Sequence, residues 1–494
     1  MLFDKITPED AGVSSKLVHK FISGLNKRNL KMHSVLFMKG EQIFGEFYWA
    51  PFNAEFNHRM YSITKSFVSV AIGLLIDDGK IHLDDKVSEL FPEKITMPIS
   101  DELKNQTIEQ MLTMTTVGQH CDWFTRDNPD RASLYFENRE KTRAPGTVWA
   151  YDSAGSQVLC QICEKYSGMR LFDFLNERIF KHLGTFKNAS ILSTKNGASW
   201  GDSAMICTPR SLASFARFVM NYGAWGGKQL ISQDYLKKAT SRVVDNVTTP
   251  HEGLIHYGYG YQIWRTENNG FAFVGMGDQL AVCFPDKDFI FVCTADNQGS
   301  SFATDYIIGT LIDLILENME NQPLPADFEG FEGLNELGAS LELFSLKGQR
   351  GSYLARELSG VKFVCDENDF GFKEFTFFFN EDGSGKLCYT NENGELELPF
   401  SMNKNYFGKF PELGYSQEYG GLRTTDGSKY DCATSLAWLQ DNKILIYTQI
   451  IDRYFGNASL TFAFNGDNAT LSFDKTAEDF LWNYKGVATA KKVK

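Results

Sequence analysis

The sequence carries no excess of positive charge. Its 494 residues include 49 Lys and Arg against 62 Asp and Glu, which gives a formal net charge of −13. Binding to nucleic acid without sequence preference depends on neutralising phosphates with cationic side chains. A nucleic-acid partner is therefore not expected, and the acidic balance by itself says little about the substrate.

Long apolar runs are absent as well. A helix that spans a bilayer needs about 20 consecutive apolar residues, whereas the longest run here, residues 67–76, has the length of a core helix. The N-terminal stretch MLFDKITPEDAGVSSKLVHK lacks the apolar segment of a secretory signal. These features predict a soluble, cytoplasmic protein that does not insert into a membrane.

Paired metal-binding motifs and phosphate-binding loops are also lacking. The nine cysteines are scattered, as is typical of free thiols in a reducing compartment. One C-x-x-C, Cys160 and Cys163, could be a redox pair or half a zinc site, but no second pair partners it, so two core residues on one helix are favoured. With no H-E-x-x-H, P-loop or G-x-G-x-x-G in strand–helix context, we expect neither metal nor nucleotide.

The chain is long enough for two or three domains, and its pattern changes past residue 317. Residues 1–317 mix helical and strand patterns. Residues 318–344 are polar with two prolines and are interpreted as a linker. Residues 345–494 consist almost wholly of strand patterns separated by turn clusters such as NEDGSG. The sequence therefore predicts an α+β domain followed by an all-β domain, either a small barrel or a meander.

Within the first domain, residues that commonly begin or end helices and strands indicate several elements. Thr208 as N-cap, Pro209 at the first helical position and Gly223 at the end predict a helix. The stretches 256–264 and 271–296 are rich in aromatic and β-branched residues and are predicted to be strands.

Four S-x-x-K sequences occur, and one of them opens a helical pattern. Ser62 and Lys65 precede an apolar run, so residues three apart share a face there. At a helix start, free N–H groups favour a developing oxyanion, and apolar surroundings favour a neutral lysine that can take the serine proton. The same residues also fit a simple helix cap followed by a solvated lysine, and this motif alone leaves both interpretations open.

A second polar motif supports the catalytic interpretation. In the stretch APGTVWAYDSAGSQVLCQICEKYSGM, Tyr151 follows a turn and stands just before a predicted helix. A phenol in such a place can move a proton between nucleophile and leaving group. Taken alone, Tyr151 is also compatible with a core aromatic.

Three stretches follow one another along the chain: MYSITKSFVSVAIGLLIDDGKIHLDDKVSELFPE, the Tyr151 stretch, and MICTPRSLASFARFVMNYGAWGGKQLIS. Together, and in this order, they resemble the motifs of the serine β-lactamase and penicillin-binding-protein superfamily, on the side of class C β-lactamases, family VIII esterases and 6-aminohexanoate-dimer hydrolases. The similarity covers roughly residues 10–315. It implies a β-lactamase-like fold, in which helices flank an antiparallel sheet and an all-α subdomain carries the nucleophile helix.

The resemblance also implies roles for individual residues. Ser62 would be the acylated nucleophile, Lys65 the general base and Tyr151 its partner in proton transfer. The family's Y-x-N is Y-D-S here, so Ser153 stands where an asparagine usually contacts substrate.

The family's third motif, K-T-G or H-x-G, finds its best match at Phe273, Val274 and Gly275. Phe273 then occupies the cationic position of the substrate-binding motif, and the Met276 N–H would join that of Ser62 as the oxyanion hole. Without the cation, β-lactams and D-alanyl peptides are less expected than the esters and amides of the esterase and 6-aminohexanoate-dimer hydrolase branch.

The sequence thus predicts a serine hydrolase for a small ester, amide or short peptide, without a cofactor. The alternatives are β-lactamase or D-amino-acid peptidase activity, or a penicillin-binding-like module without turnover. His120 and Trp123 lie in a long predicted loop and could shape the substrate cleft, and His58 could line the pocket or be structural. The oligomeric state is not predicted.

Overall fold

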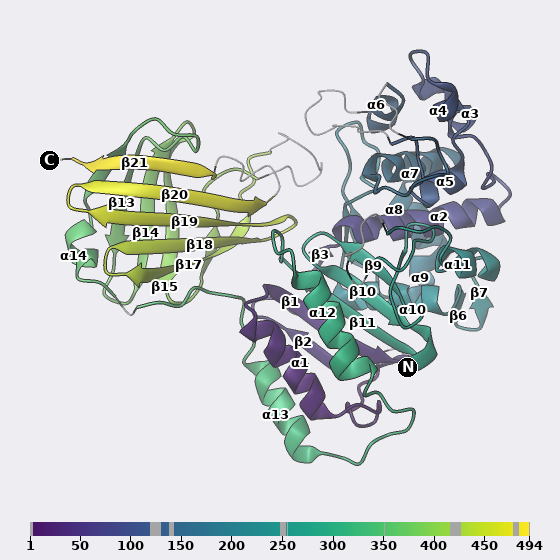
Figure 1. The fold of residues 1–494 in the computed structure, drawn as a ribbon, viewed down its shortest axis with the longest axis horizontal. Coiled ribbons are helices and arrows are strands. Elements are labelled where there is room, and N and C mark those ends of the chain that lie inside the picture. The colour runs from purple at the N-terminus through teal and green to yellow at the C-terminus, as the bar shows by residue number, and fades with distance from the viewer. Residues whose placement is uncertain are drawn as a thin grey trace. The chain divides into compact units, whose positions relative to one another are not determined.

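The computed structural model forms two compact units that divide between residues 342 and 343. Figure 1 shows helices and strands mixed in the first unit and mostly strands in the second. The described residues are 3–118, 130–137, 143–247, 253, 255–349, 351–414, 426–477 and 484–493.

Among these described residues, the first unit is built around a six-stranded antiparallel sheet of order β2-β1-β11-β10-β9-β8 (Figure 1). An N-terminal hairpin therefore pairs with strands from much later in the chain, and Val35 of β1 lies opposite Cys293 of β11. The bounds are β1 Met32–Lys39, β2 Gln42–Tyr48, β8 Trp264–Arg265, β9 Phe271–Gly275, β10 Gln279–Phe284 and β11 Phe289–Ala295. The chain between β2 and β8 carries the helices that build the site.

The two faces of this sheet contribute to two separate cores. Leu36 and Met38 of β1 belong to one apolar cluster, and Val35 and Phe37 belong to the other. Successive strand residues point to opposite faces, so helices must cover both sides. The second cluster is covered by α1 (Ser15–Lys27), α12 (Ala303–Leu311), the π-helix Ile312–Leu316 and α13 (Phe328–Ala339).

The first cluster includes helix α2 (Thr64–Asp77), which is buried continuously from Thr64 to Leu75. A helix that is apolar all round belongs in a core. Gly73 admits the ring of Tyr235, which would lie 2.5 Å from an added Cβ. The larger helices around α2 are α5 Ile108–Leu112, α6 Arg131–Glu137, α7 Ser153–Ser167, α8 Leu171–Leu175, α10 Pro209–Met220 and α11 Gln233–Ala239.

Short elements complete the first unit. The helical ones are α3 Val87–Leu90, Pro92–Lys94, α4 Asp101–Lys104, the π-helix Asn176–Phe180, α9 Lys181–Leu183 and Pro285–Lys287. The strands are β3 His58–Arg59, β4 Ser190–Ile191, β5 Met205–Cys207, β6 Ala224–Trp225 and β7 Lys228–Gln229.

Several helix ends lie where the local signals predict them. Thr208 caps α10 through its side chain, and Pro209 is the first residue of that helix. Gly79 and Gly168 follow α2 and α7 with φ values of 67° and 73°, as expected for glycines that end a helix in the left-handed region.

The prediction of a strand over 256–264 is wrong for most of its length, because the ladder includes only Trp264–Arg265. Gly258 has a φ of 115°. An added Cβ on Gly260 would lie 1.9 Å from the Ala239 carbonyl oxygen. The glycines here allow close backbone packing and do not extend the sheet.

The segment 318–344, predicted as a linker, contains an ordered helix of the first unit. Helix α13 packs against α1, Leu334 is buried in the shared core, and Lys16 lies 2.8 Å from Asp327 in an ion pair. Its polar composition reflects one exposed helix face.

The second unit is a closed β-barrel, which agrees with the predicted all-β domain. Its strands follow one another as antiparallel neighbours, and a parallel pairing of β15 with β17 closes the ring. Phe375, Phe377 and Phe462 pack inside, with ring centroids 5.0–6.0 Å apart. The elements are α14 Leu354–Leu358, β12 Lys362–Cys365, β13 Glu374–Phe379, β14 Ser384–Asn391, β15 Gly394–Met402, β16 Tyr406–Lys409, β17 Asp431–Gln440, β18 Lys443–Ile451, β19 Phe455–Asn465, β20 Asn468–Ala477 and β21 Gly486–Lys492.

Candidate active site

The candidate nucleophile lies in a tight turn between β3 and α2. A single 3₁₀ turn, Tyr61–Ile63, follows β3, and α2 begins at Thr64. Tyr61 has a φ of 46°, which is unusual for a residue with a side chain. Backbone strain of this kind concentrates at functional sites, and here it directly precedes Ser62.

The turn is tied to its neighbours by hydrogen bonds. The Thr64 hydroxyl donates to the Tyr61 carbonyl at 2.6 Å and accepts from the Met205 N–H at 2.9 Å. The Met60 N–H donates to the Met205 carbonyl at 2.8 Å. These bonds hold the strained turn in place against β5.

Lys65 is buried beside Ser62. Its Nζ lies 2.9 Å from the Ser62 Oγ and 2.7 Å from the carbonyl oxygen of Asp202. Only 2% of Lys65 is exposed, and no side-chain cap bond forms at the start of α2. A helix cap followed by a solvated lysine is therefore excluded, and the pair has the spacing of a nucleophile and its base.

Tyr151 lies next to this pair. The Lys65 Nζ is 5.0 Å from the centroid of the Tyr151 ring. The ring stacks on Trp264 at a centroid distance of 6.0 Å and an interplanar angle of 21°. Tyr151 is 43% exposed, so its phenol is available to a substrate, and it is not a core aromatic.

Tyr151 lies directly before the N-cap of α7. Asp152 caps the helix by accepting from the Gly155 N–H at 2.8 Å, and it also accepts from the Thr116 hydroxyl at 2.7 Å. Burial raises the pKa of the Asp152 carboxyl, and these hydrogen bonds oppose that shift. Ser153 is the first helical residue and is half-buried.

The end of β9 approaches the nucleophile turn. An added Cβ on Gly275 would lie 2.3 Å from the Met60 carbonyl oxygen, so only glycine allows this contact. Met276, the next residue, is 43% exposed. Its carbonyl accepts from the side chain of Gln279 at 2.9 Å, and Gln279 is also bonded to Ala295. The turn that carries Met276 is thus braced close to Ser62.

Phe273 does not line a surface that a substrate could reach. Its side chain is 0% exposed and packs against Phe215 and Phe271 at centroid distances of 5.4 and 5.9 Å. Its place in β9 matches the expected motif, but α10 covers the side chain. The assignment of Phe273 to substrate binding is corrected to a packing role.

The remaining predicted residues fall into two groups. His120 and Trp123 lie outside the described residues. His58 is buried on β3, and its Nε2 lies 2.8 Å from the Nδ1 of His33, which favours the structural role.

Two residues at the site could not be predicted from the sequence. Asp202 contributes a backbone carbonyl, which any residue could supply, so no side-chain pattern could have revealed it. Trp264 stood in the stretch predicted as a strand, but its stacking on Tyr151 joins residues more than 100 positions apart. Neither contact has a local sequence signal.

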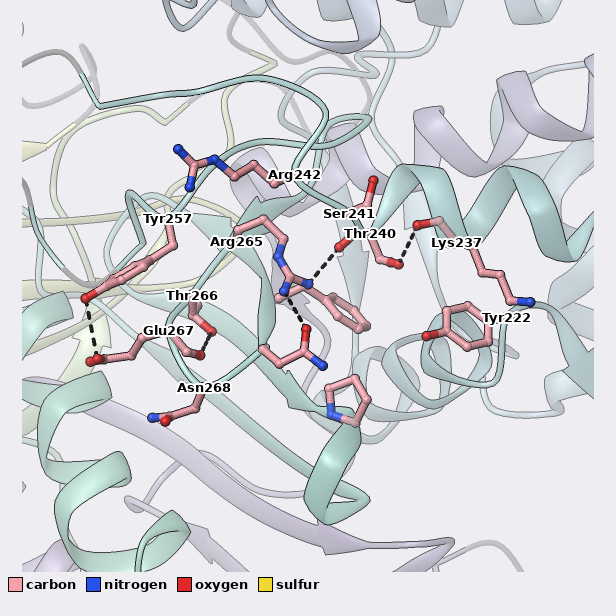
Figure 2. A pocket seen from close by; sticks show the side chains of 13 residues that line it. Tyr222, Lys237, Thr240, Ser241, Arg242, Tyr257, Arg265, Thr266, Glu267 and Asn268 are labelled. Carbon is pink, nitrogen blue, oxygen red and sulfur yellow. Dashed lines mark hydrogen bonds between the residues drawn. The ribbon is translucent and has the colours of Figure 1, made fainter.

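A pocket of about 480 Å³ lies elsewhere in the first unit, at the start of β9 (Figure 2). Arg265 crosses it and donates to the Thr240 carbonyl and to Asn269. Ser62, Lys65 and Tyr151 are not among its lining residues. It is therefore distinct from the catalytic candidates.

Within the described part of the chain, no cluster of three or more potential metal ligands occurs. Cys160 and Cys163 are free and buried in the core around α2, as the simpler interpretation of the C-x-x-C predicts. No described helix has both the length and the apolar character needed to cross a membrane.

With this geometry in view, the comparisons place the chain in a family. The Beta-lactamase family model matches residues 27–309, which is more than half of the chain. The chain therefore belongs to the beta-lactamase family, in agreement with the resemblance of its motifs, and its fold is that of a beta-lactamase-family hydrolase.

The chain is similar to one curated relative and to two solved structures described below. The 6-aminohexanoate-dimer hydrolase of Paenarthrobacter ureafaciens is 26% identical over 217 residues, 41% of this chain and 55% of that protein; the match thus spans about half of the relative's length. A Bacillus anthracis structure described as a candidate 6-aminohexanoate-dimer hydrolase is 19% identical with a TM-score of 0.52, covering 66% of this chain and 88% of its own. EstCE1, a hydrolase with promiscuous acyltransferase activity, is 14% identical with a TM-score of 0.50, covering 60% and 99%.

Proposed function

We propose that this protein is a serine hydrolase that cleaves a small ester or amide through an acyl-enzyme on Ser62. The observation that carries the proposal is the 2.9 Å separation between the Lys65 Nζ and the Ser62 Oγ, at a lysine that is 2% exposed. A nucleophile and its base within about 2.6–3.2 Å are the structural signature of covalent catalysis.

In acylation, neutral Lys65 accepts the hydroxyl proton while the Ser62 Oγ forms a bond to the substrate carbonyl carbon. The carbonyl oxygen becomes an oxyanion, and the tetrahedral intermediate collapses by breaking the bond to the alcohol or amine. That leaving group takes the proton from Lys65 through the Tyr151 phenol. Water then attacks the acyl-enzyme, and the same two side chains remove and return the proton.

The oxyanion is proposed to bind the N–H groups of Ser62 and Met276. The close approach of Gly275 to the Met60 carbonyl supports this, because it brings the β9 turn to the nucleophile turn. Preorganised backbone donors of this kind are worth roughly 10²- to 10³-fold in kcat.

The proposed substrate class is a small linear ester or amide. Phe273 offers no cation for a substrate carboxylate, because it is apolar and buried. The exposed side chains beside the nucleophile include Tyr151 and Met276, which favour apolar groups. The relative that acts on a 6-aminohexanoate dimer supports the inclusion of linear amides.

The test is a substrate panel of p-nitrophenyl acetate and butyrate, 6-aminohexanoate dimer, D-amino amides and nitrocefin. Ser62→Ala should remove at least roughly 10³-fold of the ester hydrolysis and abolish the acyl adduct seen by mass spectrometry. Ser472→Ala is the matched control, because Ser472 also begins an S-x-x-K but lies exposed on β20.

The outcomes separate the candidate functions. Unchanged turnover by Ser62→Ala contradicts the proposal. Nitrocefin turnover comparable with that of the esters would identify a β-lactamase instead. A stable label on Ser62 without turnover of any substrate would identify a binding module.

A further inference from the structure

The backbone segment that binds Lys65 is itself held by helix α7. The Gly201 N–H donates to the Gln157 Oε1 at 2.9 Å. The Nε2 of the same side chain donates to the Ser199 carbonyl at 2.8 Å. One amide thus pairs with a donor and an acceptor directly before Asp202, whose carbonyl accepts from Lys65.

Both hydrogen bonds of the Gln157 side chain are buried. Gln157 is 0% exposed and Ser199 is 1% exposed. A buried backbone group that loses its hydrogen-bond partner is destabilised, because water cannot replace the partner there. An added Cβ on Gly201 would lie 2.3 Å from the Cys160 side chain, so the segment rests directly on α7. Its position therefore depends on the face of α7 that carries Gln157.

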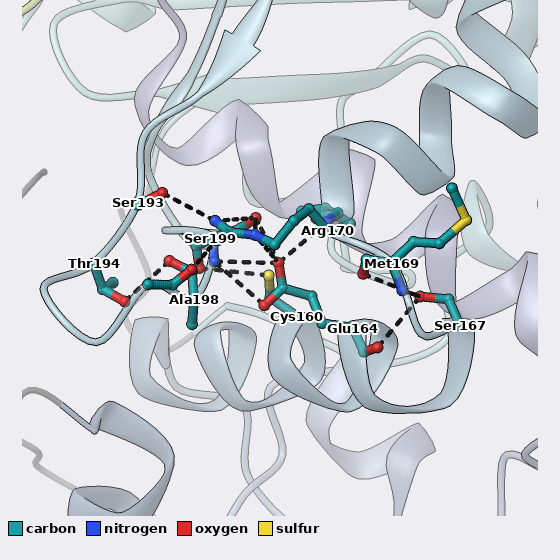
Figure 3. Close-up of polar contacts among 12 residues, drawn as sticks. Cys160, Glu164, Ser167, Met169, Arg170, Ser193, Thr194, Ala198 and Ser199 are labelled. Carbon is teal, nitrogen blue, oxygen red and sulfur yellow. Dashed lines mark hydrogen bonds and ion pairs between the residues drawn. The ribbon is translucent and has the colours of Figure 1, made fainter. Parts of the chain in front are cut away.

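A second anchor holds the beginning of the segment. The Glu164 carboxylate accepts from the Ser199 hydroxyl at 2.6 Å and from the Arg170 Nε at 2.9 Å, and Arg170 also donates to Ser193 (Figure 3). These contacts do not include Gly201 or Asp202. Loss of the Gln157 amide should therefore loosen the end of the segment near Lys65 while the anchor at Ser199 remains.

We propose that Gln157 is a positioning residue for the Lys65 base, and this inference rests on the function proposed for Lys65. A neutral amine has two N–H bonds and one lone pair. Fixing one N–H on the Asp202 carbonyl restricts where the lone pair points, and the 2.9 Å contact places Ser62 in its reach. Because α7 begins directly after Tyr151 and Asp152, one helix sets both partners of proton transfer.

The variants that test this are Gln157→Met and Gln161→Met. Methionine has nearly the same length as glutamine but can neither donate to Ser199 nor accept from Gly201. Gln161 lies one turn further along α7 and is 6% exposed; in the described part of the chain its Nε2 has no hydrogen-bond partner. The control therefore matches the change in residue type, helix and burial.

The measurements are kcat and KM for p-nitrophenyl butyrate, together with the melting temperature. Gln157→Met should lower kcat by roughly 10- to 100-fold, as expected for a misplaced catalytic group, with KM within about twofold. Gln161→Met should keep kcat within about twofold. Gln157→Glu supplies a second variant, because a protonated carboxyl restores both bonds; its kcat relative to wild type should rise as the pH is lowered.

Three results would overturn the inference: wild-type kcat in a folded Gln157→Met, equal losses in Gln157→Met and Gln161→Met, or a loss confined to KM. Should Gln157→Met fail to fold, a kcat ratio for Gln157→Glu that does not rise at lower pH has the same meaning. Lys65→Met is measured in parallel. Full activity in that variant would show that the proposed function itself has failed, which is a separate outcome.

Discussion

Replacing Gly275 with alanine tests whether the end of β9 belongs to the site. The added Cβ would lie 2.3 Å from the Met60 carbonyl oxygen, whereas ordinary contact begins at 3.4 Å. The difference, 3.4 − 2.3 = 1.1 Å, is the separation that β9 and the nucleophile turn must gain to restore ordinary contact. A displacement of about 1 Å at an active site costs about 10²-fold in rate.

The expected result for Gly275→Ala is therefore a kcat about 10²-fold below wild type, with a loss of about 1–3 kcal/mol in unfolding free energy from overpacking. Ester hydrolysis and urea denaturation measure the two quantities. Gly333→Ala is the control, because Gly333 lies within α13 with nothing near an added Cβ; it should leave kcat unchanged and stabilise by roughly 0.5–1 kcal/mol.

The changes in kcat and in unfolding free energy together decide whether Gly275 serves the active site or only the packing. If Gly275→Ala destabilises the protein but kcat stays within twofold of wild type, the contact with Met60 is packing alone. The placement of the Met276 N–H in the oxyanion hole would then be refuted.

Two further predictions concern the surroundings of the site. Phe273→Ala should cost about 3–5 kcal/mol in urea denaturation, because its ring is fully buried against Phe215; a loss below 1 kcal/mol would contradict its place in the core. Burial lowers the pKa of His58 to about 3 and that of His33 well below its usual value. Both pKa values are lower in the folded protein than in the unfolded chain, so folding is favoured when the two rings are neutral. This contribution to the free energy of unfolding is fully present above about pH 6.5 and is lost as the pH falls. Each should contribute a slope of up to about 1.4 kcal/mol per pH unit, and His33→Phe should roughly halve the combined slope measured between pH 6 and pH 4.

Much of the fold could be predicted from local pattern. Thr208 and Pro209 predicted the start of helix α10. The strand patterns between turn clusters predicted the strands of the C-terminal barrel. The stretch 256–264 was mispredicted, because its aromatic residues are typical of strands while Gly258 and Gly260 pack irregularly against other backbone. The register that closes the barrel between β15 and β17 has no local signal, because it joins distant strands.

The sequence by itself determined which groups could do the chemistry. Ser62 lies in the 3₁₀ turn that leads into α2 and Lys65 lies in the first turn of α2, so their spacing of three residues brings the two side chains to the same side of this helical run. The tertiary structure decided whether that chemistry could operate: it buries Lys65, bonds it to the Asp202 carbonyl and brings Tyr151 within 5.0 Å of its Nζ. These contacts depend on backbone atoms and on packing between distant segments, which residue identity and local spacing do not encode.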